Sequence, residues 1–175
     1  MSMAASRPVS DALAVVVMGV SGAGKTTVGR ALADALGANF IDGDDLHSEA
    51  ARAKMAAGVA LTDDDRWPWL DRVGAALASG RRIVACSALK RAYRDRIRTA
   101  AGPRLRFIYL VADAGAMRQR VASRPGHYMP ASLVDSQFAA LEPPRDEPDV
   151  IELSAEADLT TAIPALAKRL DAPTR

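Results

Sequence analysis

Residues 19–26 run Gly19-Val20-Ser21-Gly22-Ala23-Gly24-Lys25-Thr26, which matches the pattern G-x-x-x-x-G-K-[ST] at every fixed position. The apolar run Leu13–Met18 before it predicts a β-strand. The segment Lys25–Leu36 after it predicts a helix that ends at Gly37. A strand, a glycine-rich loop and a helix in this order form a site that binds phosphate groups through the backbone.

This loop predicts a binding site for ATP. Its glycines allow successive N–H groups and the helix N-terminus to face the phosphates, while Lys25 reaches the β- and γ-phosphates and Thr26 ligates Mg²⁺. A glycine-rich turn without function would explain neither side chain. The sequence therefore predicts ATP and Mg²⁺ as cofactors, with nucleotide contacts from Gly19, Val20, Ser21, Gly22, Ala23, Gly24, Lys25, Thr26 and Thr27.

The composition is that of one ordinary globular domain. The 175 residues are 49% hydrophobic and 25% charged, which is enough to bury a core. The formal net charge of +2 favours neither nucleic acid nor an anionic membrane as a partner. The single cysteine, Cys86, allows no intrachain disulfide, and the apolar run Ala12–Val20 is too short to span a membrane. We expect a cytoplasmic protein with a flexible tail over residues 1–11 and a single domain over residues 12–175.

Short apolar runs alternate with helix-length segments along the chain. This alternation predicts an α/β fold, in which a five-stranded parallel sheet lies between two layers of helices. Helices are expected over Ala114–Ala122, after the N-cap residue Asp113, and over Ala162–Leu170. The expected strands are Leu13–Met18, Asn39–Ile41, Arg82–Cys86, Leu105–Val111 and Asp149–Leu153.

The phosphate loop alone does not choose a reaction, because kinases, GTPases and motor ATPases share it. The sequence has no N-K-x-D segment of the kind that reads guanine, and its length leaves little room for the extra elements of a motor ATPase. A kinase that acts on a small molecule remains. The rest of the sequence should then supply a site for the phosphate acceptor.

Acidic residues follow directly on the second expected strand, in the run Asp42-Gly43-Asp44-Asp45. Ligands collect at the carboxyl ends of strands in open α/β sheets. Two carboxylates at such a place can divide the work: Asp42 acts toward the Mg²⁺ shell, through water, and Asp44 orients or deprotonates the acceptor hydroxyl. A solvated turn is the alternative, since Asp and Gly are common in loops.

Three basic residues are candidates for holding an anionic acceptor. Arg66 follows Asp63-Asp64-Asp65, acids that suit a capped helix start, and its planar guanidinium can bind a carboxylate through two parallel hydrogen bonds. Lys90 and Arg94 come just beyond the third expected strand and should face the same edge of the sheet. All three are therefore predicted to contact the acceptor.

Arginines also fall on and just past the helix expected over Ala114–Ala122. Arg120 and Arg124 are four residues apart and share a helix face, whereas Arg118 faces elsewhere. We predict that Arg120 and Arg124 are catalytic residues on a small helical lid, at about residues 114–130, that closes over the transferring phosphoryl group. Basic residues that merely complement the helix dipole are the alternative.

The sequence as a whole resembles the gluconokinases of the P-loop type, a family related to shikimate and adenylate kinases. The resemblance covers about residues 13–170. It is carried, in order, by Met18 through Thr26; Asp42-Gly43-Asp44 with Leu46-His47; Lys54-Met55 and Gly58; Asp63-Asp64-Asp65-Arg66 with Pro68-Trp69-Leu70; Cys86-Ser87-Ala88-Leu89-Lys90 with Tyr93-Arg94-Asp95; and Gly126-His127-Tyr128-Met129 with Ser136-Gln137-Phe138.

The resemblance implies a particular reaction and architecture. The reaction is ATP + D-gluconate → ADP + 6-phospho-D-gluconate, with Mg²⁺, and the architecture is a P-loop kinase sheet of strand order 2-3-1-4-5 with a mobile lid, commonly in a homodimer. The histidines His47 and His127 lack the clustered partners of a metal site. Together with Gln137 they are predicted as further contacts to the acceptor.

Two alternatives belong to other functions. Shikimate kinase would need the same acids and arginines, but also a glycine-rich turn where this chain has Cys86-Ser87-Ala88-Leu89. A regulatory protein that binds ATP without an acceptor is the alternative outside enzymes. The intact Lys25, Thr26, Asp42 and Asp44 disfavour it.

Overall fold

A five-stranded sheet forms the centre of the fold. The computed structural model describes residues 12–123 and 131–172. All strands of the sheet are parallel and lie in the order β2-β3-β1-β4-β5, which confirms the predicted fold class and strand order. The strands are β1 (Leu13–Met18), β2 (Asn39–Asp42), β3 (Arg81–Ala85), β4 (Leu105–Val111) and β5 (Val150–Ser154).

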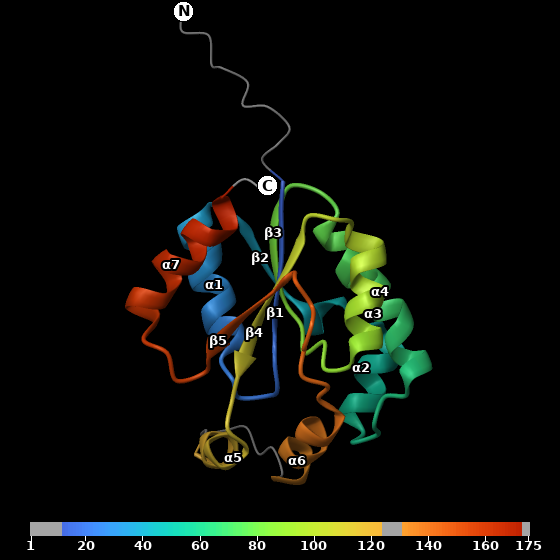
Figure 1. Ribbon diagram of the computed structural model, residues 1–175. Helices are drawn as coiled ribbons and strands as arrows, with labels where there is room; N and C mark the ends of the chain where they lie inside the picture. The colour runs from blue at the N-terminus through green and yellow to red at the C-terminus, as the bar shows by residue number, and fades with distance from the viewer. Residues whose placement is uncertain (1–11, 124–130, 173–175) are drawn as a thin grey trace, which may run out of the picture.

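Helices cover both faces of the sheet and complete three layers. Figure 1 shows α1 and α7 on one face, α3 and α4 on the other, and α5 with α6 at the carboxyl ends of the strands. The described helices are α1 (Lys25–Leu36), the short 3-10 helix η2 (Gly43–Leu46), α2 (Glu49–Ala56), α3 (Asp63–Leu77), α4 (Arg91–Ala101), α5 (Ala114–Ala122), α6 (Ala131–Ala140) and α7 (Leu159–Asp171).

The central strand β1 is buried along its whole length. Its successive side chains point to opposite faces of the sheet. Val15 and Val17 pack in one core cluster with Leu32 of α1, and Val16 packs in a second cluster with Val73 of α3. Because both faces are covered, the strand is an uninterrupted apolar run rather than an alternating one.

The ends of several elements differ slightly from the predicted ones. β2 extends to Asp42, whose side chain then accepts a hydrogen bond from the first turn of η2. β3 ends before Cys86, which is still buried, and burial raises the pKa of its thiol to about 12. α7 begins at Leu159 rather than at Ala162, because the Asp158 carboxylate accepts the N–H of Thr160 and caps the helix earlier.

Two further predictions concern the N-terminal tail and membrane crossing. The tail predicted over residues 1–11 lies outside the described residues. Within the described ranges, none of the helices combines the length and the apolar character that crossing a membrane requires.

Candidate active site

The phosphate loop joins β1 to α1 and has a backbone that glycine permits. Gly22 and Gly24 have φ angles of 84° and 98°, in the left-handed region that glycine enters without steric cost. Gly24 is also the N-cap residue of α1. The Lys25 ammonium donates to the carbonyl oxygen of Val20 at 3.0 Å, so its side chain folds back over the loop. The loop thus offers a helix N-terminus and a cation to the same anion.

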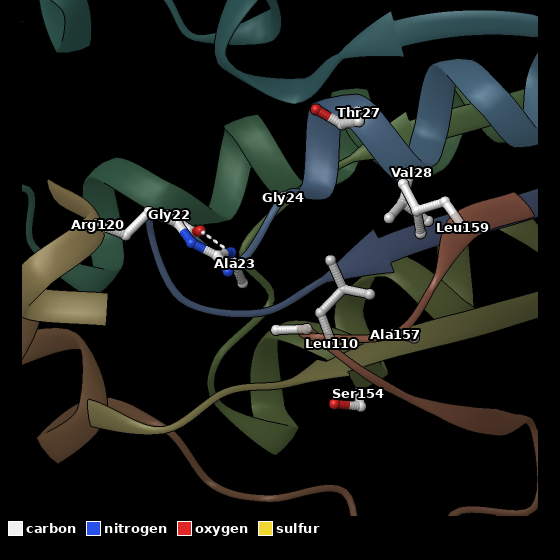
Figure 2. Close-up of a pocket in the computed structure, with 11 residues that line it drawn as sticks. Gly22, Ala23, Gly24, Thr27, Val28, Leu110, Arg120, Ser154, Ala157 and Leu159 are labelled. Carbon is white, nitrogen blue, oxygen red and sulfur yellow. Dashed lines mark hydrogen bonds between the residues drawn. The ribbon is translucent and has the colours of Figure 1, made fainter. Parts of the chain in front are cut away.

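A cavity of about 260 Å³ adjoins the loop (Figure 2). Its walls are the loop with the first turns of α1, the end of β4, and the segment that runs from Ser154 to Leu159 after β5. Apolar side chains of Val28, Leu110 and Leu159 line it, and the hydroxyl groups of Thr27 and Ser154 add polar atoms. This combination suits the base and ribose of a nucleotide whose phosphates lie in the loop.

Arg120 of α5 stands at the rim of this cavity. Its guanidinium donates to the carbonyl oxygen of Gly22 at 3.1 Å, drawn as the dashed line in Figure 2, and pairs with Glu156 at 2.6 Å. Arg118, on the same helix, instead pairs with Asp135 of α6 at 2.5 Å. The structure therefore brings Arg120 to the cavity beside the phosphate loop and turns Arg118 toward α6.

The acidic segment after β2 is pressed against the end of β3. A Cβ atom at Gly43 would lie 2.3 Å from the carbonyl oxygen of Ala85, so only glycine fits at that position. The indole N–H of Trp69 donates to the carbonyl oxygen of Gly43 at 2.8 Å. The Asp42 carboxylate accepts the N–H of Asp44 at 3.0 Å. These contacts hold the two carboxylates in place on either side of an obligatory glycine.

The pKa of Asp44 depends on its burial and on charged neighbours that include Lys25 of the phosphate loop. Burial raises the pKa of its carboxyl, and the nearby negative charge of Asp42 raises it further, whereas Lys25, and His47 when its ring is protonated, act in the opposite direction. The net result is a pKa above the ordinary value for aspartate. The phosphate loop follows β1 and the acidic segment follows β2, so both lie at the carboxyl edge of the parallel sheet. A carboxylate with a raised pKa accepts a proton more readily, as a general base must.

His47 lies three residues after Asp44, at the end of η2. Its ring stacks on Trp69 with centroids 4.1 Å apart, and its Nδ1 atom is buried without a hydrogen-bond partner. Burial lowers the pKa of this imidazole, which favours the neutral ring. The structure thus places His47 beside the predicted acceptor site, and its Nδ1 has no partner among the described residues.

Arg66 and Lys90 meet at a second carboxylate, that of Asp63. Lys90 Nζ lies 3.4 Å from Asp63, and Arg66 Nη1 lies 3.7 Å from it. The hydroxyl of Tyr93 donates to Asp63, and Arg66 Nη1 donates to the same hydroxyl at 3.4 Å. The hydrogen bond from Tyr93 and the charges of Lys90 and Arg66 lower the pKa of Asp63. Two cations and a phenol therefore converge on the carboxylate of Asp63.

Local sequence patterns assign neither Asp63 nor Tyr93 to the site. Asp63 was interpreted as one of several acids near a helix start, and the true N-cap residue of α3 is its neighbour Thr62, which forms a capping box with Asp65. Tyr93 lies three residues after Lys90, on the first turn of α4. That short spacing was the available signal, but it does not reveal the partner on α3.

Arg94 is not at the acceptor site. It is completely buried, and its guanidinium pairs with Glu147 at 2.6 Å and 2.9 Å. Its remaining N–H groups donate to the carbonyl oxygens of Ala88, Leu89 and Glu142. No donor of this guanidinium is left for a substrate, so the prediction that Arg94 binds the acceptor is corrected. The side chain instead ties α4 to the loop before β5.

Comparisons with known proteins fit this geometry. The chain is 46% identical over 152 residues to a protein named probable gluconokinase from Schizosaccharomyces pombe, covering 81% of this chain and 79% of that one. It is 42% identical over 150 residues to the thermosensitive gluconokinase of Escherichia coli K12, covering 82% and 80%. This chain belongs to the gluconokinase family. The resemblance inferred from the sequence is thereby confirmed.

Further matches agree with membership of the gluconokinase family. A crystal structure described as a gluconokinase from Sinorhizobium meliloti 1021 superposes with a TM-score of 0.81 at 42% identity, covering 91% of this chain and 96% of that one. The family model described as AAA domain matches residues 15–144, a range that includes the phosphate loop and all the acceptor-side residues described here. The protein is therefore an enzyme of the P-loop kinase type.

Of the predicted site residues Gln137, Arg124 and His127, only Gln137 lies within the described residues. Gln137 of α6 has its side-chain amide on Ser21 of the phosphate loop, at 2.6 Å and 2.8 Å. Arg124, His127 and the end of the predicted lid lie outside the described residues. Their predicted roles therefore remain predictions.

The residues near the loop suit a nucleotide-bound Mg²⁺. The described part of the chain contains no group of three or more His, Cys, Asp or Glu side chains that could hold a metal ion by itself. At nucleotide sites, Mg²⁺ is typically bound by one or two protein oxygens together with phosphate oxygens. Thr26 in the first turn of α1 and Asp42 at the end of β2 carry oxygens of the right kind. This donor set fits Mg²⁺ that arrives with the nucleotide.

Proposed function

We propose that this protein transfers the γ-phosphoryl group of ATP to D-gluconate, giving ADP and 6-phospho-D-gluconate. The observation that carries the proposal is that the phosphate loop after β1, with Lys25, and the acidic segment after β2, with Asp44, lie at the same carboxyl edge of the parallel sheet. Arg66 and Lys90 form a cationic site that accepts a carboxylate, which matches an acidic acceptor. The names of the relatives support gluconate as that acceptor.

Phosphoryl transfer depends on positioning and on charge stabilisation more than on covalent help. Lys25 and the lid arginines Arg120 and Arg124 neutralise the phosphate oxygens. As the acceptor oxygen bonds to the γ-phosphorus, the bond from that phosphorus to the bridging oxygen breaks and ADP leaves. Thr26, and Asp42 through water, would hold Mg²⁺, which would supply further neutralisation of the phosphates.

Asp44 takes the proton that the acceptor hydroxyl loses. Its raised pKa makes it a stronger base than an ordinary aspartate, and the hydrogen bond from its own N–H to Asp42 fixes the turn that aims it. Asp42 also keeps negative charge beside Asp44, which favours proton uptake. A neutral His47 next to them can contact a hydroxyl of the sugar acid without adding a charge.

Arg66 and Lys90 hold the carboxylate of gluconate. Both cations already share the carboxylate of Asp63, so the acceptor enters a site whose donors are preorganised for an anion. Both cations lie over the Tyr93 ring, Arg66 at 5.7 Å and Lys90 at 5.4 Å from its centroid, and Trp67 packs edge to face against that ring at 5.6 Å. His127 remains a predicted contact to the sugar hydroxyls.

Shikimate is the competing acceptor to test. Ala88, in the turn after β3, has a φ of 45° and is fully buried. The turn therefore has a backbone that glycine would adopt, although the sequence has no glycine there. The missing glycine is a weaker objection to shikimate than the sequence alone indicated. Gluconate is favoured because the relatives that are 46% and 42% identical to this chain are named gluconokinases.

The deciding experiment is an ADP-release assay with ATP and Mg²⁺ against gluconate, shikimate, nucleoside monophosphates and buffer alone. We expect gluconate to stimulate ADP release and the other acceptors to leave it at the level of buffer. Equal turnover with shikimate would reassign the acceptor, and equal turnover in buffer would support a protein that binds ATP without an acceptor. A cytoplasmic location and a homodimer remain expectations from the composition and the family.

A further inference from the structure

One side chain of α6 holds the phosphate loop from outside. The amide oxygen of Gln137 accepts the backbone N–H of Ser21 at 2.6 Å, and its Nε2 donates to the Ser21 hydroxyl oxygen at 2.8 Å. The two residues are separated by 116 positions in the sequence. A primary amide offers an acceptor and a donor side by side, so it satisfies both groups of Ser21 at once.

This contact changes what Ser21 can offer to a phosphate. Its N–H points at Gln137 and so is not one of the backbone donors that face the nucleotide. A hydroxyl has one donor and two acceptor positions. Because Gln137 fills an acceptor position of the Ser21 oxygen, the hydroxyl proton is left for a further acceptor. A phosphate oxygen is the acceptor for which the surrounding loop is built.

The helix that carries Gln137 is firmly placed. Val134, one turn before it, is completely buried in the core cluster that also contains Val20 and Val121. After the helix, the N–H of Glu142 donates to the carbonyl oxygen of Leu89 at 2.9 Å. A side chain on such an anchored helix can position a loop residue more sharply than one on a free segment.

Ser21 also lies toward one end of the loop. The lining of the base cavity includes Gly22, Ala23 and Gly24 and stops before Ser21. With the base on that side, Ser21 stands at the opposite end of the phosphate chain, where the transferring group lies. Gln137 reaches it from α6, and the chain just after this helix contacts Leu89, the neighbour of the predicted acceptor residue Lys90.

We propose that Gln137 is a positioning residue, which fixes Ser21 so that the Ser21 hydroxyl donates a hydrogen bond to the γ-phosphoryl group. This rests on the proposed function, because it takes ATP as the phosphoryl donor. It replaces the prediction that Gln137 contacts the acceptor directly. The consequence is specific: the contact should matter for ATP, which has a γ-phosphate, and not for ADP, which has none.

The test combines three single variants and the double variant Gln137→Met with Ser21→Ala, with separate binding and turnover measurements. Gln137→Met keeps the size of the side chain and removes both hydrogen bonds, whereas Ser21→Ala removes only the hydroxyl. Gln119→Met makes the same substitution on the exposed face of α5 and serves as the matched control. The dissociation constants of ATP and of ADP are measured without acceptor, kcat and KM are measured with gluconate, and a thermal melt checks that each variant folds.

We expect Gln137→Met to weaken ATP binding about tenfold, as for a lost hydrogen bond to a charged group, while ADP binding changes less than twofold. The turnover number should fall by a similar factor, with KM for gluconate unchanged. Ser21→Ala should reproduce the loss, and the double variant should lose no more than either single variant. Gln119→Met should behave as the wild type.

Equal weakening of ATP and ADP would overturn the proposal, and so would losses that multiply in the double variant. If Gln137→Met does not fold, Ser21→Ala decides the same question, because it deletes one hydroxyl from a half-buried residue. Failure of the proposed function is distinguishable. If the wild type does not turn over gluconate but Gln137→Met still weakens binding of ATP and not of ADP, the proposed acceptor is refuted and the role of Gln137 is retained.

Discussion

The nucleotide side of the site is made of continuous backbone, whereas the proposed acceptor side is assembled from side chains of separate elements. The loop Gly19–Thr26 and the first turn of α1 are adjacent in the chain and present N–H groups and one lysine. On the acceptor side, Asp44 follows β2, Arg66 lies on α3, and Lys90 precedes α4. A site built from backbone depends on local conformation, but a site built from side chains depends on how distant elements pack.

Two arginines near the acceptor side show what packing decides. Arg66 is about one third exposed and shares a carboxylate with Lys90, so it can take a second anion. Arg94 is completely buried, and Glu147 and three backbone carbonyls satisfy it. The same chemical group is therefore a candidate ligand in one place and a structural tie in the other. The following predictions separate the two kinds of residue by what each substitution damages.

Lys25→Ala should have the largest effect on activity. It removes the charge aimed at the β- and γ-phosphates in a confined site, and we expect turnover to fall by about a thousandfold, the upper range for loss of one preorganised electrostatic contact. Steady-state kinetics with ATP and gluconate measure it. The control is Lys168→Ala on the exposed end of α7, which should keep wild-type turnover. Near-normal turnover in folded Lys25→Ala would remove the loop from the mechanism.

Arg94→Met should damage stability instead. It leaves Glu147 buried with only Arg98 as an ionic partner, and we expect the free energy of unfolding to fall by about 3 kcal/mol. Urea denaturation measures it, and KM for gluconate should stay unchanged in the folded fraction. A selective rise in that KM without loss of stability would restore Arg94 to the acceptor site.

Lowering the pH should destabilise the fold through the buried pair of Arg94 and Glu147. Burial by itself raises the pKa of Glu147, but hydrogen bonds from Arg94 and Arg98 outweigh it and hold the pKa below the ordinary value for glutamate. A carboxylate with a depressed pKa contributes stability above its unfolded pKa, and that contribution disappears as the pH falls through the folded value. Arg94→Met should therefore lose less additional stability than the wild type when the pH is lowered below the ordinary glutamate range.

Asp44→Asn should reduce turnover by about a hundredfold while ATP binding stays nearly intact, because the amide cannot accept the hydroxyl proton. The wild-type profile of kcat/KM should lose activity as the pH falls through the raised pKa of Asp44, at a pH above that of an ordinary aspartate. In Asp44→Asn this acidic limb should be absent. Asp42→Asn is the comparison variant: a larger loss there would reverse the roles of the two acids.

Arg66→Lys should have the smallest effect. Lysine keeps the charge but not the planar pair of donors, so KM for gluconate should rise by about tenfold, the equivalent of one charge-assisted hydrogen bond. KM for ATP and the urea midpoint should hardly move. Arg104→Lys, at an exposed position just before β4, provides a matched control. An unchanged KM for gluconate would return Arg66 to a purely structural role.

The parts of the site whose place in the fold follows from the sequence are those with short-range signals. The loop Gly19–Thr26 and the acids at Asp42 and Asp44 each lie next to the strand that positions them, so spacing in the sequence sufficed. The cavity wall from Ser154 to Leu159 carries no motif, and it joins the site only because β5 lies beside β4. The contact of Gln137 with Ser21 spans 116 positions and was likewise invisible to local patterns.

The sequence by itself determined the phosphate loop and the layered parallel sheet, because both follow from residues that are neighbours in the chain: a glycine-rich turn after an apolar strand, and helices between strands. Tertiary structure alone decided which basic residue is buried. Lys90 and Arg94 are four positions apart, yet the guanidinium of Arg94 turns into the core because Glu147, 53 residues away, arrives there to neutralise it. Burial of a charge requires a partner, and packing selects that partner.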